Sequence, residues 1–325
     1  MSVWPITFED VLAARDRLRP HLPETPLRSY AALDEAVGSG VRALVKHENF
    51  QPTGAFKVRN GLSALTALGP GERARGVVAA TRGNHGLGLA WAGRRLGVSV
   101  TVCVPLGNNP EKNAAVRGLG ARLVEQGRDY DESVAAAERL VREEGLHLVH
   151  STNDPAVVAG AGTLTLEMLE EEPGVEALVF SVGGGSLAVG GLVVARARKP
   201  GLPVYAVQAA GASAIHDAWH LGRPVSKPSA DTFADGLATR NTYPATFGAL
   251  REGLAGFVAA TDAEIADALR LLLSTTHTLV EGAGAAGLAG LLKLRTVLAG
   301  KTVGVVLSGA NIDRETLRRV LAGEI

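Results

Sequence analysis

The stretch Leu178-Val179-Phe180-Ser181-Val182-Gly183-Gly184-Gly185-Ser186-Leu187 joins an apolar run to a helical pattern through three consecutive glycines. The apolar run predicts a buried strand over residues 177–182, and the following pattern predicts a helix over residues 187–198. Because glycine has no Cβ, successive N–H groups of the loop are free to fold around an anion at the positive end of that helix. The stretch therefore predicts a strand, a phosphate-binding loop and a helix, although a tight turn without a ligand remains an alternative.

Strand and helix patterns alternate on both sides of this loop, which is typical of α/β proteins with largely parallel sheets. A capping box formed by Thr7 and Asp10 predicts the start of the first helix. No repeat or long polar linker interrupts the alternation. The other predicted strands cover residues 42–46, 76–80, 98–104, 121–125, 146–150, 204–208 and 302–307, and the other predicted helices cover residues 84–96, 130–144, 162–171 and 313–321.

Length and charge limit the class of protein. A chain of 325 residues is long enough for two domains or one large one. Its 33 basic and 33 acidic residues give a formal net charge of zero. Neutrality argues against binding to nucleic acid or to a membrane surface through a global basic field. Glycine is unusually frequent, with 40 residues, which indicates many tight turns or close approaches of the backbone to a ligand.

The single cysteine, Cys103, lies in a strand pattern and is expected to be a small buried apolar residue. It has no partner in the chain for a disulfide. The first nineteen residues lack an apolar signal core, and no stretch of 18 or more apolar residues follows. We therefore expect a cytoplasmic protein.

The glycine loop also fits a dinucleotide-binding fingerprint, since Gly183, Gly185 and Ala188 satisfy G-x-G-x-x-A after a strand. That fingerprint requires an acidic residue for the ribose at the end of the next strand. Here the next predicted strand ends at Gln208, and no Asp or Glu lies between Leu187 and His216. A nicotinamide enzyme is therefore disfavoured, and an NADP enzyme is less firmly excluded.

Two more predicted strands run directly into glycine-containing loops. Residues 76–80 lead into Thr81-Arg82-Gly83-Asn84-His85-Gly86, and residues 302–307 lead into Ser308-Gly309-Ala310-Asn311. In an open parallel sheet the ligand binds beyond the carboxyl ends of the strands. We therefore expect all three loops to present amides and hydroxyls to one cleft.

Lys57 is the candidate nucleophile. It follows Gln51-Pro52-Thr53-Gly54-Ala55-Phe56, in which Pro52 and Gly54 predict a turn directly before a helix. The positive field at a helix start disfavours an ammonium, and desolvation would lower the pKa of Lys57 further. A neutral amine is what attack on an aldehyde requires.

The segments 51–57, Gly83-Asn84-His85 and 183–187 together resemble those of the serine/threonine dehydratase family, a group that also contains serine racemases. The resemblance extends from Thr25-Pro26-Leu27 to Ser308-Gly309-Ala310-Asn311. It implies a fold type II pyridoxal-phosphate (PLP) enzyme, similar to the tryptophan synthase β chain, with the cofactor in a cleft between two open twisted α/β domains. It further implies a large domain of residues 1–75 and 154–325, a small mobile domain of residues 76–153, and a homodimer.

The same resemblance assigns roles to residues. Lys57 would form the Schiff base with PLP and remove the Cα proton, and Phe56 would pack beside the ring. Asn84 would bind the ring hydroxyl, and Ser308 would face the pyridine nitrogen. A neutral hydroxyl there does not keep the ring protonated, which favours expulsion of a β-leaving group. The cofactor phosphate would be held by Gly183, Gly184, Gly185, Ser186 and Leu187, and the substrate carboxylate by Thr81, Arg82, Gly83 and His85. For His85, a structural ring bonded to the backbone is an equally open alternative.

Arg82 departs from the family, in which Ser or Ala commonly precedes Gly-Asn-His. In serine racemases that serine is the acid/base on the second face of Cα, and a guanidinium cannot take up a proton there. Racemisation is therefore disfavoured as the main activity. Arg82 either points to solvent or a dimer partner, or pairs with the cofactor phosphate or a substrate carboxylate. If it binds a second carboxylate, hydroxyaspartate is favoured over threonine.

Two absences also distinguish the chain from relatives. The stretch 208–214, Gln-Ala-Ala-Gly-Ala-Ser-Ala, has no carboxylate where many relatives bind a divalent cation, so we predict no metal at that site. One predicted helix follows residues 308–311, so we expect no C-terminal regulatory domain.

These observations favour PLP-dependent elimination of water and ammonia from a small β-hydroxy amino acid such as L-threonine or L-serine. The alternatives are a 3-hydroxyaspartate or phenylserine dehydratase, an amino-acid racemase, and an idle PLP- or nucleotide-binding module. The glycine-containing loops 235–240 and 277–284 are expected to approach the substrate pocket.

Overall fold

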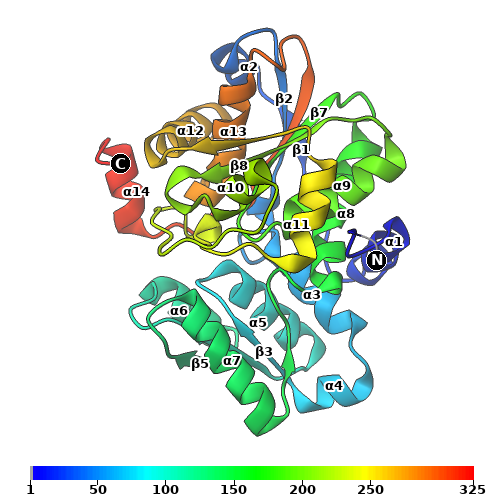
Figure 1. The fold of residues 1–325 in the computed structure, drawn as a ribbon, viewed down its shortest axis with the longest axis vertical. Helices are drawn as coiled ribbons and strands as arrows, with labels where there is room; N and C mark the ends of the chain where they lie inside the picture. The colour runs from blue at the N-terminus through cyan, green and yellow to red at the C-terminus, as the bar shows by residue number, and fades with distance from the viewer. Residues whose placement is uncertain (1–2) are drawn as a thin grey trace.

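Two separate sheets organise the chain in the computed structural model, which describes residues 3–325. The larger, six-stranded sheet occupies the upper part of Figure 1, and the four-stranded sheet occupies the lower part. All pairings are parallel except that of β1 with β2. The predicted α/β class is confirmed.

The six-stranded sheet has the order β1-β2-β10-β7-β8-β9. Its central strands are buried on both faces, as their continuous apolar runs require. Two edge strands, β1 and β9, were not among the predicted strands. β1 is only three residues long, and β9 begins at a glycine. The strands are β1 (Leu27–Ser29), β2 (Arg42–Lys46), β7 (Ala177–Ser181), β8 (Val204–Ala209), β9 (Gly256–Ala260) and β10 (Thr302–Val306).

Helices cover both faces of this sheet, and each face has its own apolar core. One core is built on α1 (Phe8–Leu18), α8 (Pro155–Glu171), α9 (Ser186–Arg198), α10 (Ala214–Leu221) and α11 (Pro244–Gly253). The other is built on α2 (Ala31–Val37), α12 (Asp262–Thr276), α13 (Gly282–Leu294) and α14 (Arg314–Leu321).

The four-stranded sheet has the order β5-β4-β3-β6, with Cys103 buried inside β4. The strands are β3 (Val77–Ala80), β4 (Val100–Val104), β5 (Arg122–Glu125) and β6 (His147–Leu148). α3 (Lys57–Ala67), α5 (Asn84–Leu96) and α6 (Pro110–Gly118) contribute to the core on one face, α7 (Tyr130–Glu144) packs on the other, and α4 (Pro70–Arg75) precedes β3. Short 3-10 helices are η1 (Glu48–Phe50), η2 (Ala210–Ala212) and η3 (Asp235–Leu237).

Most predicted elements agree with the structure, and α5 and α7 have the predicted bounds. α8 begins at Pro155, well before the predicted residue 162. The reason is local, because the Asp154 side chain accepts hydrogen bonds from the amides of Ala156 and Val157 and Pro155 occupies the first helical turn. β6 retains only two residues of the predicted strand 146–150.

α3 connects the two layers. On one side, a Cβ added to Gly61 would lie 2.6 Å from the carbonyl oxygen of Gly88 in α5. On the other side, a Cβ added to Gly160 in α8 would lie 2.6 Å from the carbonyl oxygen of Arg59. Only glycine permits such close backbone approach. Because α3 packs on both sides, the proposed domain boundary at residue 75 remains a prediction.

A buried ion cluster fixes the start of α3. The Arg59 guanidinium donates to Glu48 at 2.8 Å and to Glu167 at 2.5 Å, and Lys46 Nζ lies 2.7 Å from Glu167. All four side chains are nearly inaccessible to solvent. The cluster ties β2, η1 and α8 to the helix that begins at Lys57. Among the described residues, no helix is both long and apolar enough to cross a membrane.

Candidate active site

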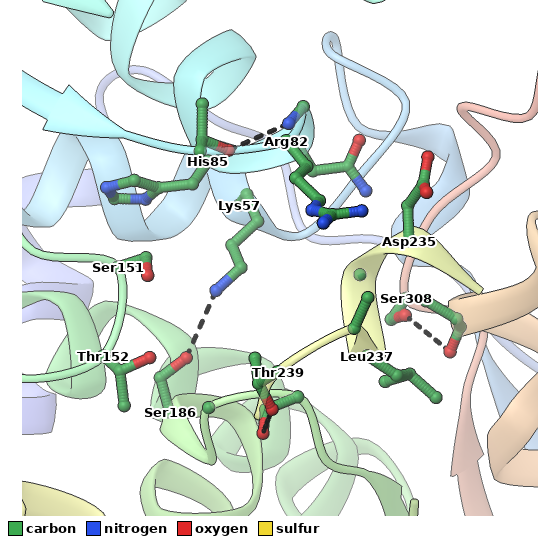
Figure 2. Close-up of a pocket in the computed structure, with 18 of the residues that line it drawn as sticks. Lys57, Arg82, His85, Ser151, Thr152, Ser186, Asp235, Leu237, Thr239 and Ser308 are labelled. Carbon is green, nitrogen blue, oxygen red and sulfur yellow. Dashed lines mark hydrogen bonds between the residues drawn. The ribbon is translucent and has the colours of Figure 1, made fainter. Parts of the chain in front are cut away.

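One cavity lies between the two sheets, and Figure 2 shows the side chains that surround it. The loops after β3, β7 and β10 all line it, as expected for the carboxyl ends of parallel strands. Every residue that we predicted for the site contributes to the lining: Phe56, Lys57, Thr81, Arg82, Gly83, Asn84, His85, Gly183, Gly184, Gly185, Ser186, Leu187 and Ser308.

Lys57 is the first residue of α3, and its amine is directed into the cavity (Figure 2). The Nζ lies 3.3 Å from the Oγ of Ser186 and 4.8 Å from the centre of the Phe56 ring. Desolvation lowers the pKa of Lys57 to about 8. No carboxylate forms an ion pair with Lys57 in residues 3–325. The amine is therefore far easier to deprotonate than a surface lysine.

The carbonyl oxygens of the loop from Gly183 to Gly185 all accept hydrogen bonds within the protein, that of Gly185 from the amide of Val189. The hydroxyl of Thr239 donates to the carbonyl oxygen of Gly183 at 3.1 Å, and that of Thr246 donates to Gly184 at 2.8 Å. Gly185 has a φ of 103°, in the left-handed region that favours glycine. A Cβ on Gly183 would collide with the carbonyl of Gly236, and one on Gly184 with the side chain of Thr152. The loop is thus a cradle of N–H groups at the start of α9.

Asn84 begins α5 and is held on two sides. Its Oδ1 accepts a hydrogen bond from Asn311 Nδ2 at 2.8 Å, and its Nδ2 donates to Glu281 Oε1 at 2.5 Å. Burial raises the pKa of Glu281 to about 7, although Lys112 opposes the shift. Residue-level reasoning placed the segment 277–284 near the pocket but did not single out Glu281. Its acidic side chain after the apolar residues Leu279 and Val280 was the available signal.

Ser308 follows β10 and is 5% exposed. Its hydroxyl donates to the carbonyl oxygen of Ala283 at 3.3 Å (Figure 2). The group at this place is neutral, so it imposes no charge on a ligand that contacts it.

His85 is held as a neutral ring. Its Nε2 donates to the carbonyl oxygen of Val149 at 3.1 Å. Burial, followed by the nearby charge of Lys57, lowers the pKa of His85 to about 3. In the same loop, Thr81 Oγ1 accepts a hydrogen bond from the amide of Gly83 at 2.9 Å. These bonds fix the backbone ahead of α5, whose first N–H groups have no partner within the helix.

The loop 235–240, which we expected near the pocket, lines it from Asp235 to Thr239. Lys112 of α6 donates to Asp235 of η3 at 2.8 Å, which joins the small sheet's layer to the large one across the cavity. Lys112 carried no clear signal in the sequence, because a single lysine in a helical pattern is indistinguishable from a surface charge. The same holds for the polar lining residues Tyr130, Ser151 and Thr152.

In the stretch 208–214, the side chain of Gln208 binds backbone amides. Gln208 Oε1 accepts hydrogen bonds from the amides of Ile215 and His216, at 3.1 and 2.9 Å. The side chain therefore supports the start of α10. Over the described part of the chain, no three His, Cys, Asp or Glu side chains gather as a metal site would require.

A family model for pyridoxal-phosphate dependent enzymes matches residues 18–309. The chain belongs to this family. One family member similar to it is an L-threonine ammonia-lyase of Geobacter sulfurreducens, 40% identical over 95% of this chain and 76% of that protein. Another is the L-threo-3-hydroxyaspartate ammonia-lyase of Saccharomyces cerevisiae, 31% identical over 98% of this chain and 97% of that one. The solved structure of maize serine racemase matches with a TM-score of 0.92 and 27% identity over 99% of this chain and 98% of that one.

The cavity fits the family's cofactor. PLP carries an aldehyde and a phosphate. Here the desolvated amine of Lys57 lies 3.3 Å from the Oγ of Ser186, the residue that follows the three glycines of the cradle. The collisions that a Cβ would cause at Gly183 and Gly184 explain why the cradle is made of glycines. Hydroxyl and amide donors, Ser308 and Asn84, lie on the remaining sides.

Proposed function

We propose that the protein is a PLP-dependent ammonia-lyase that converts a β-hydroxy amino acid, such as L-threonine or L-serine, to a 2-keto acid and ammonia. The observation that carries the proposal is the buried amine of Lys57 opposite the glycine cradle, with the neutral Ser308 hydroxyl in the same cavity. The relatives named as ammonia-lyases support the reaction class.

Each group that lines the cavity has a separate role in the proposed reaction. PLP, when bound, supplies the electron sink for the pair left behind at Cα. The amides of 183–187 hold its phosphate, and Asn84 and Ser308 orient its ring. Lys57, whose pKa desolvation lowers to about 8, takes the proton from Cα in its neutral form. The N–H groups at the start of α5 hold the substrate carboxylate.

The overall reaction balances without an oxidant. The Cα–H and Cβ–O bonds break and water leaves. One water then hydrolyses the resulting imine, so the net change is loss of ammonia and formation of a keto acid. The alternative enzymes are an amino-acid racemase and a dehydratase acting on hydroxyaspartate or phenylserine. The non-enzymatic alternative is a protein that binds PLP or a nucleotide without catalysing a reaction.

We also propose a homodimer, a cytoplasmic location, and a small domain of residues 76–153 that moves against the rest. Phe50 and Leu279 support an interface: they are 48% and 40% exposed, and Asn49 Nδ2 donates to the Leu279 carbonyl at 3.0 Å. The lone buried cysteine supports a reducing compartment. The Lys112–Asp235 bridge supports closure between the two layers.

Keto-acid release from threonine, serine, hydroxyaspartate and phenylserine tests the reaction. We expect release from at least one of them by wild type, and no release by Lys57→Ala. Lys293→Ala, at a surface lysine paired with Glu264 at 2.6 Å, is the control and should keep wild-type turnover. The proposal would be refuted if Lys57→Ala released keto acid at the wild-type rate. It would also be refuted if wild type released keto acid from none of the four substrates.

A further inference from the structure

We propose that Arg82 selects substrates with a second carboxylate, so that the preferred substrate is a β-hydroxy amino diacid of the 3-hydroxyaspartate type. This inference rests on the proposed function and narrows its substrate class. The product would be a keto diacid, formed by the same loss of ammonia. Threonine and serine, which lack the distal carboxylate, would be poorer substrates.

Arg82, in the loop after β3, lines the cavity. Figure 2 shows its side chain reaching into the cavity, with the guanidinium between Lys57 and Asp235 in this view. Its Nε is buried and has no hydrogen-bond partner. No ion pair joins Arg82 to another of the described residues. Arg82 is partly exposed, but a charged side chain whose Nε is buried without a partner is costly, so the site suits an anionic group that arrives with a ligand.

The neighbouring charges do not supply that anion. Asp235, an acidic residue that lines the cavity with Arg82, is held by Lys112 at 2.8 Å. Burial raises the pKa of Glu281, and its Oε1 accepts from Asn84. Of the basic side chains in the cavity wall, Lys112 is therefore paired and Lys57 is readily neutral. Arg82 is left as the uncommitted cation among the lining residues that the structure describes.

The substrate's first carboxylate and the cofactor phosphate have other partners. The phosphate fits the glycine cradle of 183–187 on the opposite wall, below Lys57 in Figure 2. The α-carboxylate fits the N–H groups that open α5, directly after Gly83. Two anion-binding features, the helix start and the Arg82 fork, thus come from one loop. A substrate with two carboxylates engages both.

The cavity also has room beyond Cβ. A second, more polar hollow adjoins the first, and the two share Arg82, Lys112, Asp235 and Glu281 as walls. Arg82 therefore lies at the junction of the two hollows, where we place the substituent on Cβ. A planar guanidinium binds a carboxylate there through two parallel hydrogen bonds.

The test compares kcat/KM for 3-hydroxyaspartate and serine in wild type and Arg82→Gln. We expect wild type to prefer hydroxyaspartate, and the variant to lose roughly 10- to 100-fold more on hydroxyaspartate than on serine. Arg82→Lys, which keeps the charge but not the fork, should fall in between. An equal loss on both substrates, or a wild-type preference for serine, would overturn the inference.

A matched control removes another arginine of the same cleft. Arg128 lines only the second hollow and is paired with Glu132. Arg128→Gln should change the ratio of the two kcat/KM values by less than about two-fold, because the charge of Arg128 is exposed to solvent screening and already paired with Glu132. A change as large as that of Arg82→Gln would mean that the general field of the cleft sets the preference.

Equilibrium binding separates this inference from the reaction. Calorimetry with the holoenzyme should show succinate binding more tightly than butyrate, and Arg82→Gln should remove most of that difference. If no amino acid is turned over but this difference holds, the proposed reaction fails and the diacid site stands. If keto acid forms but succinate and butyrate bind alike, the reaction stands and the diacid site fails.

Discussion

The Nζ of Lys57 lies 3.3 Å from the Oγ of Ser186, so the first residues of α3 and α9 face each other across the cavity. Both helices direct their positive ends to this point. That arrangement favours an anion between them and disfavours an ammonium. It gives a physical reason for a lysine and a glycine loop, 126 positions apart from Lys57 to Gly183, to serve one ligand.

The rate at which apoprotein captures PLP should rise with pH around a midpoint of about 8. Burial lowers the pKa of Lys57 to about 8, and only the neutral amine attacks the aldehyde. At pH 7 about one molecule in ten then holds a neutral amine. Stopped-flow absorbance over pH 6 to 10 measures the profile, and a midpoint near that of a free lysine would contradict the desolvation account.

Glu281→Gln should flatten part of the pH dependence of stability in the apoprotein. Burial raises the pKa of Glu281 to about 7, from an ordinary value of 4.5. Between these values the native state binds more protons than the unfolded state, so this residue's contribution to the unfolding free energy falls as pH rises from about 4.5 to about 7. Between pH 5 and pH 8, the unfolding free energy of wild type should fall by roughly 1–3 kcal/mol more than that of the variant, as measured by chemical denaturation. An equal fall in both proteins would contradict a raised pKa for Glu281.

Loss of the buried Arg59 guanidinium should be severe. Arg59→Met leaves Glu48 and Glu167 buried with Lys46 as their nearest cation. We expect a loss of about 3–5 kcal/mol in the free energy of unfolding, or no folded protein. Arg122→Ala, which removes an exposed pair with Glu144 at 2.7 Å, is the control and should cost less than about 1 kcal/mol. Comparable small losses in both would show that the cluster is not needed.

Local patterns were sufficient for the strands, helices and loops that carry the cofactor chemistry. The residues next to Gly183, Gly185 and Lys57 in the chain predict their local structure. An apolar run precedes the glycines, a turn precedes Lys57, and a helix follows in both places. The sequence placed the segments 235–240 and 277–284 near the pocket. The pairings of Asp235 with Lys112 and of Glu281 with Asn84 became visible only in the structure, because each joins residues more than a hundred positions apart. The hydroxyls of Thr239 and Thr246, which donate to the carbonyl oxygens of Gly183 and Gly184, likewise became visible only in the structure.

Turnover should survive removal of divalent cations. In the stretch 208–214 the Gln208 oxygen is engaged by the amides of Ile215 and His216, and no carboxylate is present. Activity in excess EDTA should therefore stay within about two-fold of the untreated enzyme. Complete loss that magnesium restores would show a cation site elsewhere in the protein.

Reduction of the holoenzyme with borohydride, followed by peptide mass spectrometry, tests the central claim most directly. Borohydride converts a lysine–PLP linkage to a stable phosphopyridoxyl-lysine. We predict that the label is found on Lys57, the desolvated amine opposite the glycine cradle, and that Lys57→Ala carries none at any lysine. A label on another lysine, or no label on wild-type protein saturated with PLP, would contradict the account.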